Sequence, residues 1–145
     1  MKGKTFLFLS ACCFLLSCSV QPEPIQFGKE SCHFCKMTIV DQQHAAQMVS
    51  KKGKQFKYDA IECMLNDLSE SKNSEAIEIF LVSNYGESAM TNAESATYLI
   101  SKKIKSPMGA FLSAFQSQEN AKNTWNEVGG ELYSWQEIKQ KYAVD

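Results

Sequence analysis

The first eighteen residues constrain this chain most, because they decide how much of it is left to fold. Lys2 and Lys4 precede an apolar stretch from residue 6 to residue 16, which has the length of an export signal and is too short for a permanent membrane helix. Loss of residues 1–17 leaves about 128 residues, enough for one domain or two small halves that share a core. The remaining 13 basic and 16 acidic side chains include no arginine, which argues against nucleic-acid binding.

The apolar stretch ends at Leu15-Leu16-Ser17-Cys18, an apolar residue and a small residue followed by cysteine. This order resembles the lipobox of bacterial lipoproteins, in which the cysteine is diacylated and becomes the first residue of the mature protein. The resemblance implies a lipid on Cys18 and attachment to a membrane of the cell envelope. Ser19 in place of aspartate is consistent with the periplasmic face of the outer membrane. An ordinary cleaved signal or an uncleaved anchor is the alternative.

Three thiols remain after the signal is removed and Cys18 is blocked by lipid: Cys32, Cys35 and Cys63. An odd number of thiols in an oxidising compartment cannot all pair within one chain. Either one disulfide forms and one thiol stays free, or the thiols stay reduced because they bind something.

The Cys-x-x-Cys spacing of Cys32 and Cys35 is found in thioredoxin-like redox sites, zinc sites and copper sites. The residues that follow, 36–40, favour a strand rather than the helix that lowers a thiol pKa in redox sites. In an extended segment Cys35 and Met37 lie on one face, about 6–7 Å apart. A thiolate and a thioether at this spacing suit Cu(I) better than zinc, and simple core packing is the alternative for Met37.

Three further side chains are candidate ligands. Cys63 lies in the first turn of a predicted helix, away from its apolar stripe. It is a candidate third ligand, a resolving thiol or a small buried residue. His33 lies between the paired cysteines, and His44 lies in a predicted connection between strands. Three cysteines with one histidine would also make a zinc site. Because no Ser–His–Asp arrangement, phosphate loop or carboxylate pair stands out, the sequence predicts a binding protein and not an enzyme.

The rest of the pattern predicts an α+β fold of two pseudo-repeated ββαβ units, mainly antiparallel sheet with packed helices and a C-terminal helix. We expect residues 18–29 to form a tether and residues 30–145 to form one domain, with halves at about 30–86 and 87–145. The predicted strands are 37–40, 45–50, 55–58, 78–82, 97–104, 110–115 and 131–133.

Capping signals predict where the three helices begin. Asp59 with Glu62 is close to a capping box, and Ile61, Met64, Leu65 and Leu68 follow as the apolar stripe of the first helix. A second helix begins after its cap at Ser117, carries Ala121, Trp125 and Val128, and ends at Gly129-Gly130. The final helix begins at Ser134, with Glu137 three residues later.

With these residues in place, the chain resembles the NosL family of lipoprotein copper chaperones associated with nitrous-oxide reductase maturation. The likeness runs from Cys18 to about Tyr142 and rests on the order and spacing of several short elements. They are Cys35-Lys36-Met37, Asp41, Ala46-Gln47, Tyr58-Asp59, Cys63, Pro107-Met108-Gly109, Ala114-Phe115 and Gly129-Gly130.

The resemblance implies a Cu(I) carrier in which Cys35 and Met37 bind the ion. Its expected partners are the membrane, through the N-terminal lipid, and an apo copper enzyme such as nitrous-oxide reductase or a copper transporter of the envelope. Cys32 departs from the family pattern and makes the site richer in thiolate. An envelope thiol–disulfide protein that uses Cys32 and Cys35, and a zinc-binding lipoprotein, are the alternatives.

Overall fold

The computed structural model describes residues 19–70 and 75–144. The export signal and Cys18 therefore lie outside the described residues. In chain order the elements are β1 (Ala46–Ser50), β2 (Gln55–Tyr58), α1 (Ile61–Glu70), β3 (Ile77–Ser83), β4 (Met90–Asn92), β5 (Thr97–Ile100), β6 (Leu112–Phe115), α2 (Gln118–Val128), β7 (Glu131–Tyr133) and α3 (Trp135–Lys141). Across both described ranges, none of the helices has the length and apolar character needed to cross a membrane.

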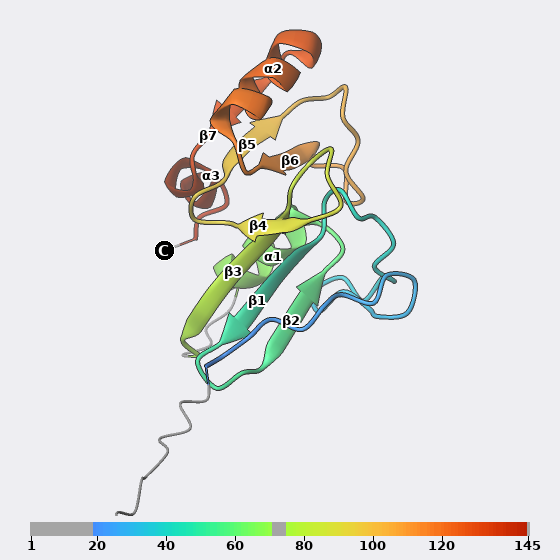
Figure 1. Ribbon diagram of the computed structural model, residues 1–145, viewed down its shortest axis with the longest axis vertical. Coiled ribbons are helices and arrows are strands. Elements are labelled where there is room, and N and C mark those ends of the chain that lie inside the picture. The colour runs from blue at the N-terminus through green and yellow to red at the C-terminus, as the bar shows by residue number, and fades with distance from the viewer. Residues whose placement is uncertain (1–18, 71–74, 145) are drawn as a thin grey trace, which may run out of the picture.

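The strands form two antiparallel sheets that share one internal order (Figure 1). In the first sheet β1 lies between β2 and β3, and β4 extends the edge of β3. In the second sheet β5 lies between β6 and β7. Each unit therefore places its first strand at the centre, which confirms the predicted α+β fold of two ββαβ units. Beyond the ββαβ order, the first unit contains strand β4, which the sequence pattern did not predict, and the second unit ends with helix α3.

Helix α1 packs against one face of the first sheet (Figure 1). Ile61, Met64 and Leu65 are fully buried, and their i, i+3, i+4 spacing places them on the same side of the helix. Met48 and Phe56, which face each other across β1 and β2, belong to this core as well. The apolar stripe predicted for this helix is confirmed.

The other face of the first sheet is covered by residues 19–30, which we call the N-terminal arm. Gln47 and Lys57 are register partners on β1 and β2 and are buried, although both are polar. The Gln47 side-chain amide donates to the carbonyl oxygen of Glu23 at 2.9 Å, and the Lys57 ammonium donates to that of Pro24 at 3.0 Å. The segment predicted as a tether thus lies along the sheet, while the domain boundary at residue 30 stays a prediction.

The alternation predicted along β6 is confirmed. Leu112 and Ala114 face the main core, whereas Phe115 packs with Leu99 and Ala121 in a smaller core beneath α2. Both strands of this hairpin are shorter than predicted. The chain turns after β5, where the N–H of residue 104 donates to the carbonyl oxygen of residue 101 at 3.0 Å, and residue 111 has a φ of 60° before β6.

The helix starts of the second unit are those predicted. Ser117 accepts hydrogen bonds from the backbone N–H groups of residues 119 and 120 and so caps α2. Ser134 and Glu137 form a reciprocal capping box at α3. On α2, Trp125 is 42% exposed, and its indole N–H donates to the carbonyl oxygen of Gly130 at the surface.

The capping box predicted for α1 is wrong. The helix begins at Ile61, and neither predicted capping side chain serves its end. Asp59 accepts a hydrogen bond from the Cys35 thiol at 3.4 Å, and Glu62 accepts one from the Ser106 hydroxyl at 2.5 Å. Both carboxylates therefore hold other segments of the chain in place.

Candidate metal centre

The three cysteines in the described part of the chain lie together. Cys32 and Cys35 belong to the loop that follows the arm, and Cys63 lies in the first turn of α1. Asp59, directly after β2, completes the group, and the four donor atoms all lie within 4.8 Å of one another. All three thiols are free. Asp59 was missed as a site residue, although its spacing to Cys63 is part of the family pattern.

The cysteine loop closes on itself instead of extending as a strand. The N–H of Cys32 donates to the carbonyl oxygen of Met37 at 2.7 Å, and the N–H of Lys36 donates to that of Cys32 at 3.1 Å. Lys36 has a φ of 66°, which turns the chain between Cys35 and Met37. The strand predicted over residues 37–40 is wrong: within residues 31–44, only Thr38 pairs, in an isolated bridge with Ser31. Cys35 and Met37 therefore do not share one face of a strand.

The sulfur atoms lie at different depths. Cys32 and Cys63 are buried, with 1% and 0% of their surface exposed, while Cys35 is half-buried. The side chain of Met37 is 54% exposed, and its backbone N–H donates to the Cys35 sulfur. Cys35, with the backbone of Met37 beside it, thus forms the outer rim of a cluster whose other two thiols lie inside the protein.

Of the three thiols in the cluster, Cys32 has the lowest pKa. The Cys63 thiol donates a hydrogen bond that lowers the pKa of Cys32 to about 6, with further help from the N–H groups of Asp59 and Cys35. Burial raises the pKa of Cys35 to about 11, and hydrogen bonds to Cys32 and Asp59 add to that rise. The hydrogen bond to Cys32, with burial, raises the pKa of Cys63 as well. At neutral pH, Cys32 is therefore a thiolate that accepts a hydrogen bond from the Cys63 thiol, while Cys35 and Cys63 keep their protons.

Comparison with known proteins agrees with this architecture. The family model of NosL matches residues 24–143. The chain belongs to the NosL family. The copper-binding lipoprotein NosL of Stutzerimonas stutzeri is 29% identical over 128 residues, which cover 81% of this chain and 67% of the relative.

The crystal structure of the copper chaperone NosL from Shewanella denitrificans has the same fold, with a TM-score of 0.72 at 20% identity. The match covers 85% of this chain and 98% of that structure. The resemblance drawn from the sequence is confirmed. Neither relative is named as an enzyme, in agreement with the sequence interpretation.

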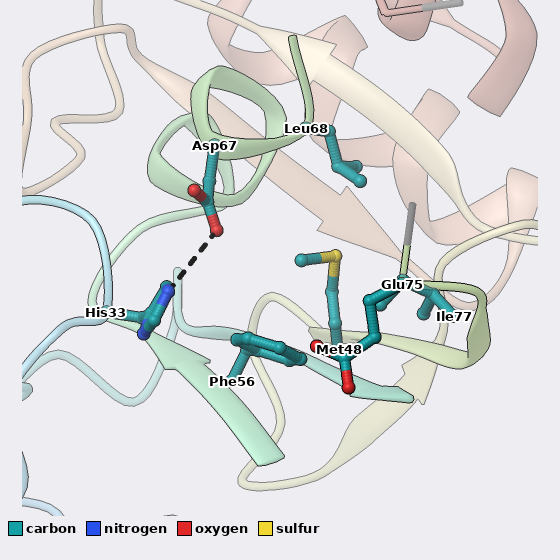
Figure 2. Close-up of a pocket in the computed structure, with 7 residues that line it drawn as sticks. All are labelled: His33, Met48, Phe56, Asp67, Leu68, Glu75 and Ile77. Carbon is teal, nitrogen blue, oxygen red and sulfur yellow. Dashed lines mark ion pairs between the residues drawn. The ribbon is translucent and has the colours of Figure 1, made fainter. Parts of the chain in front are cut away.

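In this NosL-family chain, His33 is not among the donors grouped with the three cysteines. Its ring lines a small pocket with Asp67, Met48 and Phe56 (Figure 2). Its Nε2 lies 3.9 Å from Asp67 Oδ2, and its ring stands edge-on to that of Phe56 at 4.9 Å between centroids. The structure therefore does not place His33 with the cysteines.

His44 is also not among the grouped donors, and it joins the two units. It is buried, with Nδ1 at 3.1 Å from Asp41 Oδ2 and Nε2 at 3.3 Å from the Ser113 hydroxyl of β6. This row has the residue types of a catalytic triad, which the sequence does not display because 69 residues separate His44 from Ser113. Ser113 is fully buried, so its hydroxyl is closed to substrates, and the row serves as a polar link between the units.

Proposed function

We propose that this protein binds Cu(I) through Cys32, Cys35 and Met37 and carries it to a copper-requiring protein of the cell envelope. The observation that carries the proposal is the convergence of three free thiols, with their donor atoms and that of Asp59 within 4.8 Å of one another. Thiolate and thioether donors favour Cu(I) over harder ions. The names of the two relatives, a copper-binding lipoprotein and a copper chaperone, support the same function.

Binding begins at the ligand that is already charged. The pKa of Cys32 at about 6 provides a thiolate at neutral pH, held by N–H and S–H donors. Cys35, whose pKa is raised to about 11, releases its proton as the ion binds. Cys63 is a third thiol within reach of the ion, and we assign neither His33 nor His44 to the site.

Release follows from the different depths of the donors. Cys35 and Met37 lie at the rim, so a thiol or imidazole of the receiving protein can approach the ion from outside. The incoming ligand binds before Cys32 dissociates from the ion, because a sulfur-bound cuprous ion with two or three ligands can accept one more. The buried Cys32 retains the ion until that ligand arrives.

The location and destination belong to the same proposal. A lipid on Cys18 holds the protein in the envelope, on the periplasmic face of the outer membrane, and several acyl chains give firm attachment. The receiving protein is an apo copper enzyme, such as nitrous-oxide reductase, or a copper transporter. Radiolabelled palmitate should be incorporated in the parent and not in Cys18→Ser. Copper-loaded protein should restore the absorption spectrum and activity of purified apo-enzyme, whereas the same amount of copper-loaded Cys35→Ser should not.

Anaerobic titration with Cu(I) against a competing chromophoric chelator tests the site itself. We expect Cys35→Ser to lower the affinity about 100-fold, which is about 2.8 kcal/mol, and Met37→Leu to lower it about tenfold. Met90→Leu is the matched control, because Met90 lies on β4 and accepts a hydrogen bond from Ser83 instead. If Cys35→Ser and Met37→Leu bind as tightly as the parent, the site is misassigned.

The same preparation separates the alternatives. Asp59 and three cysteines would also supply four donors for zinc, and zinc retained through purification with loss of the fold on chelation would favour a zinc lipoprotein. Turnover of a dithiol substrate through a Cys32–Cys35 disulfide would favour a thiol–disulfide protein.

A further inference from the structure

The N-terminal arm begins beside the turn that joins β1 to β2, as Figure 1 shows for the dark blue end of the described chain. The side-chain amide of Gln55 donates to the carbonyl oxygen of Gln21 at 3.0 Å and to that of Gly53 at 3.2 Å. One amide group therefore ties the arm to the turn. Gln21 in turn donates to the Ser19 hydroxyl at 3.2 Å.

This contact determines where a lipid on Cys18 would lie relative to the turn. Cys18 directly precedes Ser19, and consecutive Cα atoms are about 3.8 Å apart. A lipid on Cys18 would therefore be attached within a few residues of the turn. Little free chain is left to hold the domain away from the membrane surface.

The turn itself, residues 51–54, is basic and ordered, and we call it the lysine turn. Lys51, Lys52 and Lys54 are all exposed. The Ser50 hydroxyl accepts hydrogen bonds from the backbone N–H groups of Lys52 and Lys54, at 3.3 and 3.1 Å. Gly53 supplies the positive φ of 82° that closes the turn.

Two of its charges are uncompensated. Lys54 pairs with Glu75 at 3.6 Å and lies over the ring of Phe56. Lys51 and Lys52 form no ion pair with any residue in the ranges 19–70 and 75–144. A rigid positive surface beside a lipid attachment point matches the charge of a membrane that contains anionic lipids.

We propose that the lysine turn faces the membrane and binds the headgroups of anionic phospholipids; this rests on the proposed lipid at Cys18. Each lysine near an anionic surface strengthens attachment about five-fold. Because the lipid already provides firm attachment, the main effect of the lysines is to fix the orientation of the domain.

The orientation places the metal centre away from the lipid. Strand β2 runs from the lysine turn at one end to Asp59 at the other, and six residues of extended chain from Gly53 to Asp59 span about 20 Å. The rim formed by Cys35 and Met37 then lies at the end of the sheet that an incoming protein can reach.

Amine acetylation followed by mass spectrometry tests the surface on the full lipidated chain. The protein is reconstituted in vesicles of phosphatidylcholine alone and in vesicles with 30% phosphatidylglycerol. We expect acetylation of Lys51 and Lys52 to be at least about three-fold slower with phosphatidylglycerol and to recover in 0.5 M NaCl. Lys102 and Lys103, an exposed pair after β5, are the internal control and should react equally in both vesicles.

A pair of matched variants sharpens the result. The readout is Lys54, the third lysine of the turn, and how far vesicles with phosphatidylglycerol slow its acetylation. This protection should disappear in Lys51→Glu/Lys52→Glu and persist in Lys102→Glu/Lys103→Glu. Equal acetylation of Lys51 and Lys52 in both vesicles, or equal protection of all four lysines, would overturn the proposal. An unmodified Cys18 in the intact mass would overturn the anchor and this surface together. Copper titration of Lys51→Glu/Lys52→Glu should match the parent, so a failure of the copper site is detected separately.

Discussion

Helix α1 of the first unit and helix α3 of the second are preceded by similar residues. Each has a short polar side chain followed three positions later by glutamate: Asp59 with Glu62, and Ser134 with Glu137. At α3 both side chains stay at the helix end, where Glu137 accepts the Ser134 N–H at 2.7 Å. At α1 both side chains reach away from the helix end, one to the cysteine loop and one to the turn before β6.

The difference teaches which helix start serves the fold and which serves the site. The capping box of α3 satisfies the backbone of its own helix and nothing else. The two carboxylates of α1 instead position segments from other parts of the chain, and one of them lies among the thiols. In the first unit, Asp59 and Glu62 contact other segments instead of capping α1, and Asp59 belongs to the candidate metal centre. In the second unit, Ser117 caps α2 and Ser134 caps α3.

The largest effect should come from Glu62. Its Oε1 accepts hydrogen bonds from the Ser106 hydroxyl and the Ala110 N–H, and the side chain is buried. Glu62→Ala should lower the free energy of unfolding by about 2 kcal/mol, because buried donors lose their acceptor. Chemical denaturation checks this value.

The matched control is the glutamate in the first turn of α2. Glu119 is exposed, and Glu119→Ala should change the free energy of unfolding by less than about 0.5 kcal/mol. Equal losses in Glu62→Ala and Glu119→Ala would contradict the special role assigned to the first unit.

An intermediate effect is expected for Asp59. Burial is the main cause of the raised pKa of Cys35, and the hydrogen bond to Asp59 raises it further. Asp59→Asn should therefore lower that pKa, so that more Cys35 thiolate is present at neutral pH. Alkylation of Cys35 in the metal-free protein should become about 3- to 10-fold faster, as measured by mass spectrometry across pH.

The stability of Asp59→Asn gives the second half of that comparison. Because Asp59 does not cap α1, the free energy of unfolding should fall by less than the roughly 1 kcal/mol that loss of a cap costs. A slower alkylation of Cys35, or a loss of stability typical of a missing cap, would show that the role given to Asp59 is wrong.

The smallest effect belongs to the second unit. Ser134→Ala should lower the free energy of unfolding by about 0.5–1 kcal/mol, since the box at the exposed start of α3 is lost. Its Cu(I) affinity, measured by the same chelator competition, should equal that of the parent. A changed affinity would mean that the two helix starts are not as independent as their contacts indicate.

Much of the fold could be predicted because its signals are local. The alternation along β6, the stripe on α1 and the caps at Ser117 and Ser134 each depend on residues a few positions apart. The pseudo-repeat followed from the order of such elements.

The site was only partly predictable because its geometry depends on distant segments. The spacing of Cys32 and Cys35 predicted a shared site, while Cys63 was left open as a third ligand, a resolving thiol or a small buried residue. The structure brings the three together, and the assignment of ligands stays a prediction. The left-handed Lys36 and the use of Asp59 were missed, because a loop that bonds to itself overrides strand propensity. The row of Asp41, His44 and Ser113 was missed because 69 residues separate His44 from Ser113.

The arm that covers the first sheet has a mechanical consequence. It leads directly to the loop that holds Cys32, so with the proposed lipid on Cys18 a pull on the N-terminal end would be directed toward that loop. The hydrogen bonds that Gln47, Gln55 and Lys57 donate to the arm would bear this load first. The proposed anchor would thereby leave the thiols isolated from movements of the membrane.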